Sequence, residues 1–220
     1  MTETDENSGI LIGAIVDDLP QTIQEYIQHA IGSDQHQKGI YYFAILASAC
    51  YLESVLEDFC NNWCISRSYQ DSGFQRRLMN TIAHDVSRAT GLDAWNKWLR
   101  VLFDIDVKAV IGDDWEPLVV LFKLRNQLAH GRTTKFPHFW NADGRFLGLT
   151  LEGSSYEAPF KHLIDKGLIQ VGKGTSPSSK SLLTRSVAQY FWEVVERAIL
   201  SLKNVPELSS LRHESSNGKA

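Results

Sequence analysis

Residues 39–66 read GIYYFAILASACYLESVLEDFCNNWCIS, and apolar side chains return along this stretch at every third or fourth position. Such spacing follows the 3.6-residue turn of an α-helix, so it predicts one long helix with an apolar face. Glu53 and Glu57 lie four residues apart beside that face. Because an apolar helix face must be covered by other elements, the stretch favours a helical bundle. The apolar stripe consists of Tyr42, Ile45, Leu46, Ala49, Leu52, Leu56 and Phe59.

The rest of the chain supplies candidate partners for this helix. Residues 132–178 are rich in glycine and proline and contain short alternating runs, which predict a loop or small β-hairpin insertion. Because helical spacing recurs in most of the remaining chain, the predicted fold class is all-α. The predicted architecture is a bundle of about six helices that forms one domain over residues 10–203. Residues 1–9 and 204–220 are polar and are expected to be disordered. Helical spacing predicts the five further helices at residues 10–31, 74–89, 92–111, 115–130 and 179–203.

The composition limits the setting in which the protein works. The formal net charge is −4 and the sequence pI is about 6.0, so binding to nucleic acid would require a local basic patch. Charged residues interrupt the apolar runs, so no transmembrane helix is expected. The acidic start MTETDENSG is unlike a secretory signal. With three cysteines and no signal, a reducing cytoplasmic location is predicted.

The segment Leu118–Gly131, LVVLFKLRNQLAHG, carries a pattern of functional interest. Arg125, Asn126 and His130 stand near the end of an apolar helix that stops at a glycine. This arrangement resembles the HEPN superfamily, whose mark is Arg-x4-His with a polar residue directly after the arginine. The stretch ASACYLESVLEDFC is similar to the second recurrent helix of that family, with Glu53 at the place of its frequent glutamate. The resemblance covers about residues 40–131 and the closing helix.

The resemblance implies a metal-independent endoribonuclease, acting as a toxin or in antiviral defence. It implies a homodimer that brings two motifs into one cleft, with RNA as substrate and a neutralising protein as a possible partner. No cofactor and no metal are expected. The resemblance assigns catalysis to Arg125, His130 and Asn126, and a supporting role to Glu53, which would tether Arg125 or the motif helix.

The residues themselves suit this chemistry. Cleavage of RNA through its own 2′-OH needs proton transfer and a cation beside the developing phosphorane. His130 titrates near neutral pH, and the guanidinium of Arg125 matches phosphoryl oxygens. Asn126 would orient His130 or the phosphate, because positions four apart are neighbours on a helix. Arg125 and His130 lie about 140° apart around an ideal helix, so they converge only through the length of arginine, the helix end or a second subunit.

Structural interpretations of the same residues remain open. Arg125 beside an apolar stripe is often an ion-pair partner, here of Glu53 or Glu57, and a histidine before a terminal glycine often only complements the helix end. Cys60, Cys64 and His84 do not complete a four-ligand zinc set. The tryptophans at helical spacing are typical of a core or a dimer interface. A basic rim around the motif would consist of Lys161, Lys166, Lys173, Lys180, Arg132, Lys135 and Arg145.

Two alternatives to the ribonuclease follow. One is a HEPN module without catalysis that dimerises and binds a nucleotide, a nucleic acid or a protein, which the low pI and the long insertion favour. The other is an unrelated helical interaction protein with a chance motif.

Overall fold

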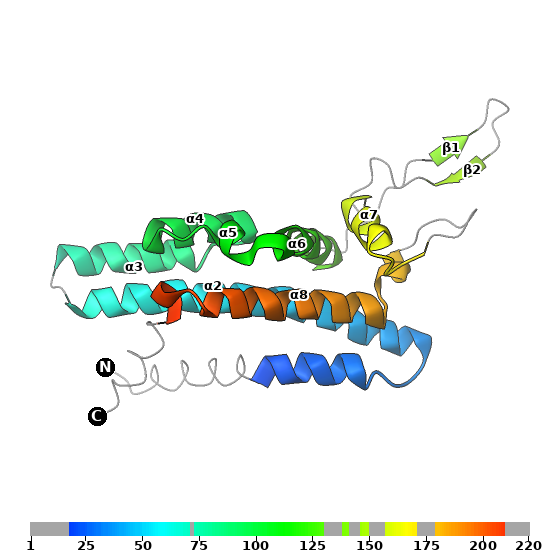
Figure 1. Cartoon of the computed structure of the whole chain (residues 1–220), viewed down its shortest axis with the longest axis horizontal. Coiled ribbons are helices and arrows are strands. Elements are labelled where there is room, and N and C mark those ends of the chain that lie inside the picture. The colour runs from blue at the N-terminus through cyan, green and yellow to red at the C-terminus, as the bar shows by residue number, and fades with distance from the viewer. Residues whose placement is uncertain are drawn as a thin grey trace. The chain divides into compact units, whose positions relative to one another are not determined.

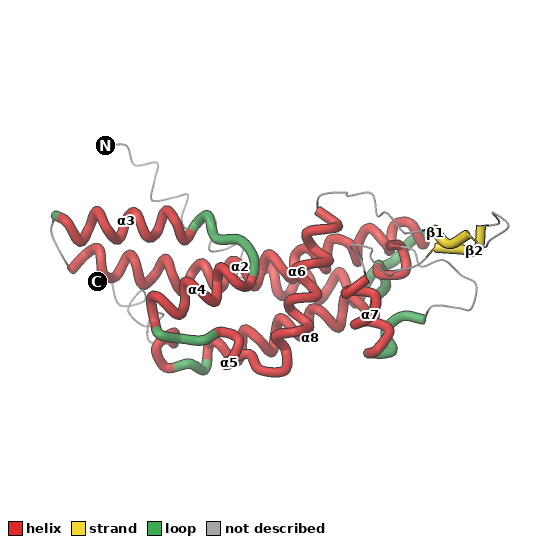
Figure 2. The backbone as a smooth tube through the Cα atoms, turned by 90° about the horizontal axis from the view of Figure 1, so that it is seen from above, coloured by secondary structure: helices red, strands yellow, loops and turns green. Residues whose placement is uncertain are grey.

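The structure is a computed structural model of the whole chain, and it describes residues 18–70, 73–129, 138–140, 146–149, 157–170 and 179–209. Helices account for nearly all of the regular structure in these residues, so the protein is all-α (Figures 1 and 2). Residues 18–28 are helical, and seven labelled α-helices follow. They are α2 (Asp34–Gln70), α3 (Phe74–Val86), α4 (Leu92–Phe103), α5 (Val107–Ile111), α6 (Trp115–Ala129), α7 (Glu157–Asp165) and α8 (Arg185–Lys203).

Two short 3-10 helices and two strands complete the described structure. The 3-10 helix η1 (Gly112–Asp114) leads into α6, and η2 (Ser179–Leu182) precedes α8. Strands β1 (His138–Trp140) and β2 (Phe146–Leu149) pair antiparallel, with an irregular register between Phe139 and Trp140. The predicted insertion thus contains this pair.

The chain divides into two compact units, and α2, α6 and α8 contribute to both. Unit 1 comprises residues 1–49 and 117–193, and unit 2 comprises residues 50–116 and 194–220. The fully buried side chains of unit 1 include Ile23, Ile27, Ile45, Leu118, Leu121, Leu124, Phe160, Leu163, Phe191 and Trp192. Those of unit 2 include Leu52, Leu56, Trp95, Leu99, Ala198 and Leu202.

Helix α2 is longer than the sequence pattern predicts. The helix begins at Asp34, five residues before the predicted stretch of residues 39–66, and it continues to Gln70. Ser33 explains this beginning, because its side-chain oxygen accepts a hydrogen bond from the backbone N–H of His36 at 3.3 Å. In unit 1 the helix of residues 18–28 folds back along α2, and Tyr26 meets Phe43 edge to face with ring centroids 5.6 Å apart (Figure 1).

The expectation that the chain has no transmembrane helix stays a prediction, although α2 passes a simple test for one. Within Asp34–Ile65 this helix contains an 18-residue window that is long and apolar enough to cross a membrane, judged by length and composition alone, since few charges interrupt it. Half of that window is buried inside the structure. The core helix of a soluble protein passes the same test, so the finding is weak support for a membrane span.

Two local features raise the helix count above the predicted six. The predicted helix at 92–111 is broken, because Asp104 adopts a left-handed conformation with φ 58° and Asp106 caps a new helix. The Asp106 carboxylate accepts hydrogen bonds from the backbone N–H groups of Lys108 and Ala109, at 3.1 and 3.4 Å. The second feature is α7, which lies within the predicted insertion and buries Phe160 and Leu163.

The ends of the chain are described only in part. Residues 206–209, assigned to the tail by the sequence, form a helical turn in which Leu208 is buried. Residues 1–9 and 210–220 lie outside the described residues.

Candidate active site

Helix α6 positions the residues singled out by the sequence. Asp113 and Asp114 precede it, and Pro117 occupies its first turn, where a missing N–H costs nothing. Leu118, Leu121 and Leu124 are completely buried, so one side of α6 is fixed in the core of unit 1. The side chains of the last turn, residues 125–129, are half-buried or exposed.

Arg125 and Asn126 form a contact on this last turn. Arg125 is half-buried and Asn126 is exposed, and Arg125 Nη1 donates a hydrogen bond to Asn126 Oδ1 at 2.9 Å. Neighbouring residues on a helix point about 100° apart, so only the length of the arginine allows the contact. The bond restricts the position of the guanidinium. Asn126 therefore orients Arg125, a role that the sequence analysis does not anticipate.

Tyr42 anchors the end of α6. The hydroxyl of Tyr42, on α2, donates a hydrogen bond to the backbone carbonyl of Leu128 at 3.2 Å. The last four carbonyls of a helix have no partner within the helix, and this bond satisfies one of them. Both residues belong to unit 1. Tyr42 thus fixes the backbone two residues before His130.

Removal of that hydroxyl gives a first prediction. In Tyr42→Phe the part-buried carbonyl of Leu128 loses its partner, so the free energy of unfolding should fall by about 1 kcal/mol. Urea denaturation measures this loss, and hydrogen exchange should accelerate in the last turn of α6. The matched control is Tyr26→Phe, because Tyr26 is 47% exposed and its hydroxyl has no hydrogen bond to the described residues. Equal stability of the two variants would contradict the anchoring role.

Two further residues were predicted for the site, His130 and Glu53. His130 directly follows α6 and lies outside the described residues. Glu53 belongs to unit 2, where its Oε1 accepts a hydrogen bond from the backbone N–H of Gly91 at 3.2 Å. This bond holds the turn that precedes α4. The tethering of Arg125 by Glu53 stays a prediction.

His162 and Tyr190 form a pair that no sequence motif indicates. His162 Nε2 on α7 lies 2.8 Å from the hydroxyl of Tyr190 on α8, and both side chains are half-buried in unit 1. The pair joins α7 to α8. The two residues are 28 positions apart and share no motif, so only recognition of α7 itself could have suggested their proximity.

The two buried cysteines, Cys60 and Cys64, are unsuited to nucleophilic catalysis. Burial, together with the neighbouring thiol of Cys64 and the carboxylate of Glu57, raises the pKa of Cys60 to about 12. Burial also raises the pKa of Cys64. Both therefore stay protonated at neutral pH, and only a thiolate is an effective nucleophile. Within the parts of the chain that the structure describes, no cluster of three or more His, Cys, Asp or Glu could hold a metal ion.

The three cysteines differ in exposure, and this difference predicts how fast each thiol reacts with a labelling reagent. Cys50 is exposed, whereas Cys60 and Cys64 are buried. At pH 8 a thiol reagent should therefore modify one cysteine of the native protein quickly and all three after denaturation. Cys50→Ser should remove the fast phase. Fast labelling of two or three thiols in the native protein would contradict the buried positions.

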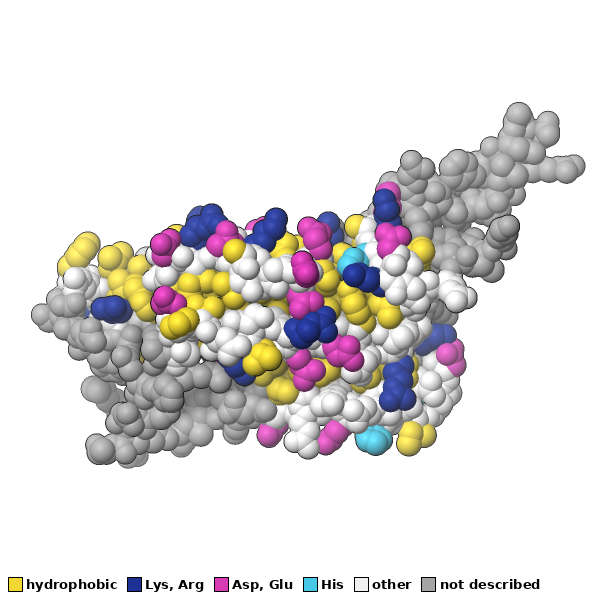
Figure 3. All heavy atoms as spheres, viewed as in Figure 1, with side chains coloured by type: hydrophobic (Ala, Val, Ile, Leu, Met, Phe, Trp, Pro, Cys, Tyr) yellow, Lys and Arg dark blue, Asp and Glu magenta, His cyan; other side chains and the backbone are white. Residues whose placement is uncertain are grey.

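Acidic and basic side chains are both present on the surface of the described residues (Figure 3). Figure 3 shows basic and acidic side chains interspersed over one face of the molecule. Of the predicted basic rim, Lys161 and Lys166 on and beside α7 are exposed, and most of the others lie outside the described residues. Comparison with known proteins adds no further constraint. No family model, curated protein or solved structure matches the chain. The site must therefore be interpreted from its own chemistry.

Proposed function

We propose that the chain is a HEPN-like domain that cleaves RNA without a metal ion. The observation that carries the proposal is the last turn of α6, where a half-buried arginine is oriented by Asn126. In the sequence His130 comes directly after Ala129, the last residue of α6, and two residues after Leu128, whose carbonyl Tyr42 anchors. A cation and a titratable imidazole at one helix end are the two groups that the reaction needs.

In the proposed reaction the 2′-OH of one nucleotide attacks the adjacent phosphorus and the bond to the 5′-oxygen breaks. His130 moves the proton that the hydroxyl loses or the leaving oxygen gains. Arg125 binds the phosphoryl oxygens, where negative charge increases in the transition state. Asn126 keeps the guanidinium in place, and Glu53 supports the motif helix. The products are a 2′,3′-cyclic phosphate and a 5′-hydroxyl.

The proposal extends to the setting of the enzyme. A single copy offers one Arg125 and one His130, so a homodimer that joins two helix ends is the proposed active form. The finer fold, one HEPN-like bundle over residues 10–203 with an insertion at 132–178, belongs to the same proposal. We place the protein in the cytoplasm as a toxin or antiviral effector, neutralised there by a protein partner.

A non-catalytic module is the second candidate. The net charge of −4 favours it, because a ribonuclease benefits from electrostatic attraction to RNA. Such a module would retain α6 for dimerisation and bind a nucleotide, a nucleic acid or a protein.

Expression in a bacterial host distinguishes the two. Wild type should arrest growth and fragment cellular RNA, whereas His130→Ala at the same soluble level should do neither. Intact RNA with wild type would count against the enzyme, and equal effects of both proteins would count against the assignment of His130.

A further inference from the structure

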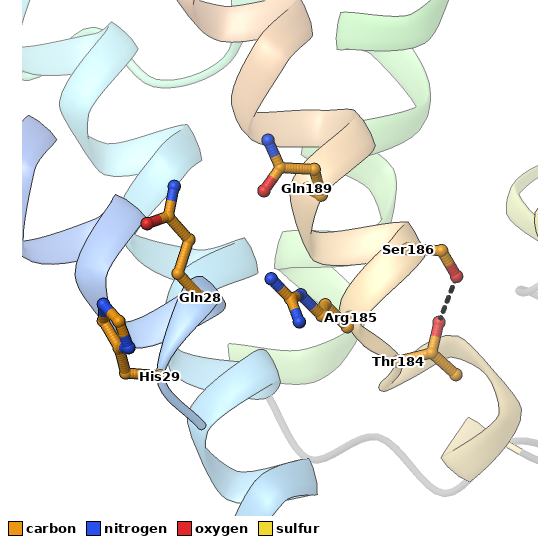
Figure 4. Close-up of a pocket in the computed structure, with 6 residues that line it drawn as sticks. All are labelled: Gln28, His29, Thr184, Arg185, Ser186 and Gln189. Atoms are coloured by element: carbon orange, nitrogen blue, oxygen red, sulfur yellow. Dashed lines mark hydrogen bonds between the residues drawn. The ribbon is translucent and has the colours of Figure 1, made fainter. Parts of the chain in front are cut away.

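Unit 1 contains an open cleft whose lining is separate from the proposed active site (Figure 4). Its volume is about 880 Å³, within the range of pockets that hold small ligands. One wall is the end of the first helix and the other is the start of α8. The lining residues are Gln28, His29, Thr184, Arg185, Ser186 and Gln189.

The lining of the cleft contains basic side chains and no acidic ones. It includes Arg185 and a histidine but no aspartate or glutamate. Arg185 is exposed and forms no hydrogen bond or ion pair with any described residue. Other arginines are engaged: Arg100 pairs with Asp106, and Arg197 binds Asp114 through two hydrogen bonds at 2.8 and 3.0 Å. The guanidinium of Arg185 is thus a cation facing a cleft without a counter-ion among its lining residues.

Neutral donors accompany this cation. Figure 4 shows the side chains of Arg185 and Gln189 extending from α8 toward the wall that carries Gln28. The Gln28 amide has no hydrogen bond to the described residues. Gln189 Nε2 donates to Glu193 Oε1 at 2.8 Å, which holds its amide in place. The hydroxyls of Thr184 and Ser186 turn aside and lie 3.2 Å from each other. Arg185, Gln28 and Gln189 are therefore the groups available to a ligand.

We propose that this cleft binds a phosphate group, carried by a nucleotide or by the backbone of RNA. The planar fork of Arg185 matches two phosphate oxygens, and the amide N–H groups of Gln28 can reach another. Gln189 contributes less, because its amide nitrogen already donates to Glu193. No acidic residue lines the cleft itself, and the nearby carboxylate of Glu193 is hydrogen-bonded to Gln189, so an anion beside Arg185 meets little repulsion. Arg125, Asn126 and Tyr42 do not line the cleft. Phosphate binding here can therefore be tested independently of the proposed ribonuclease activity.

Calorimetric titration of the full chain with inorganic phosphate and with AMP tests the site. Wild type should bind both saturably. Arg185→Gln should weaken binding about tenfold or more, because it removes a charge-assisted hydrogen bond, and Gln28→Leu should weaken it a few-fold. The matched control is Arg76→Gln, which removes an exposed arginine from α3 in the other unit. Circular dichroism checks that each variant is folded.

A second titration identifies the source of the phosphate. The probes are short 2′-O-methyl RNAs, which cannot be cleaved through a 2′-OH, with and without a 5′-phosphate. Preference for the 5′-phosphorylated RNA assigns the cleft to terminal phosphates, and equal affinity assigns it to the backbone. Either result supports the proposal if it depends on Arg185. Absence of binding by wild type to all probes, or equal affinities of wild type and Arg185→Gln, would overturn it.

Discussion

Replacement of Arg125 or His130 by alanine is expected to slow RNA cleavage by about 10²- to 10⁴-fold. Loss of a general acid or base and loss of a group that binds the developing charge each have effects of this size. Arg125→Lys should recover only part of the rate, since an ammonium keeps the charge but not the planar fork. Single-turnover cleavage of a labelled RNA measures these rates without the influence of product release.

The control for these variants lies on the same helix. Lys123 is exposed on α6 two residues before Arg125, so Lys123→Ala removes a cation from the helix without touching the motif. Its cleavage rate should stay within a few-fold of wild type. A rate for Arg125→Ala equal to that of Lys123→Ala would mean that Arg125 contributes only general positive charge.

The largest expected change in stability belongs to Phe160→Ala. Phe160 is completely buried on α7, and its removal leaves a cavity in unit 1. Substitutions of buried phenylalanine by alanine typically lower the free energy of unfolding by about 3–5 kcal/mol. Urea denaturation of the full chain, followed by circular dichroism, measures the difference.

A neighbour on the same helix provides the comparison. Ile164 is 37% exposed, so Ile164→Ala should cost about 1 kcal/mol or less. If Phe160→Ala is no more destabilising than Ile164→Ala, the burial of α7 is wrong. The helix would then be a surface attachment and not part of the core.

The sequence was most informative where apolar spacing persists over many turns. Helices α2, α6 and α8 are long, and their buried positions recur at helical spacing. Helix α7 has only nine residues between segments rich in glycine, so its short pattern was lost in that context. The break after α4 depends on the left-handed Asp104 and the cap at Asp106, which are local events that override continuous apolar spacing.

For the candidate site, too, the sequence predicted the local pattern but not the contacts between distant residues. Arg125 and Asn126 were identified because their signal is contiguous. The bond from Tyr42 to Leu128 joins residues 86 positions apart, and the cleft at Arg185 joins the first helix to the last. Contacts of this kind depend on how helices pack, which apolar periodicity does not specify. The sequence therefore indicated which residues matter on α6 but not what positions them.

Cleavage of a labelled RNA by the purified wild-type protein in EDTA tests the central claim most directly. The account predicts fragments that end in a 2′,3′-cyclic phosphate and a 5′-hydroxyl, formed at the same rate with and without the chelator. Failure to cleave ribosomal, transfer and messenger RNA would contradict the account, as would cleavage that stops when metal ions are removed.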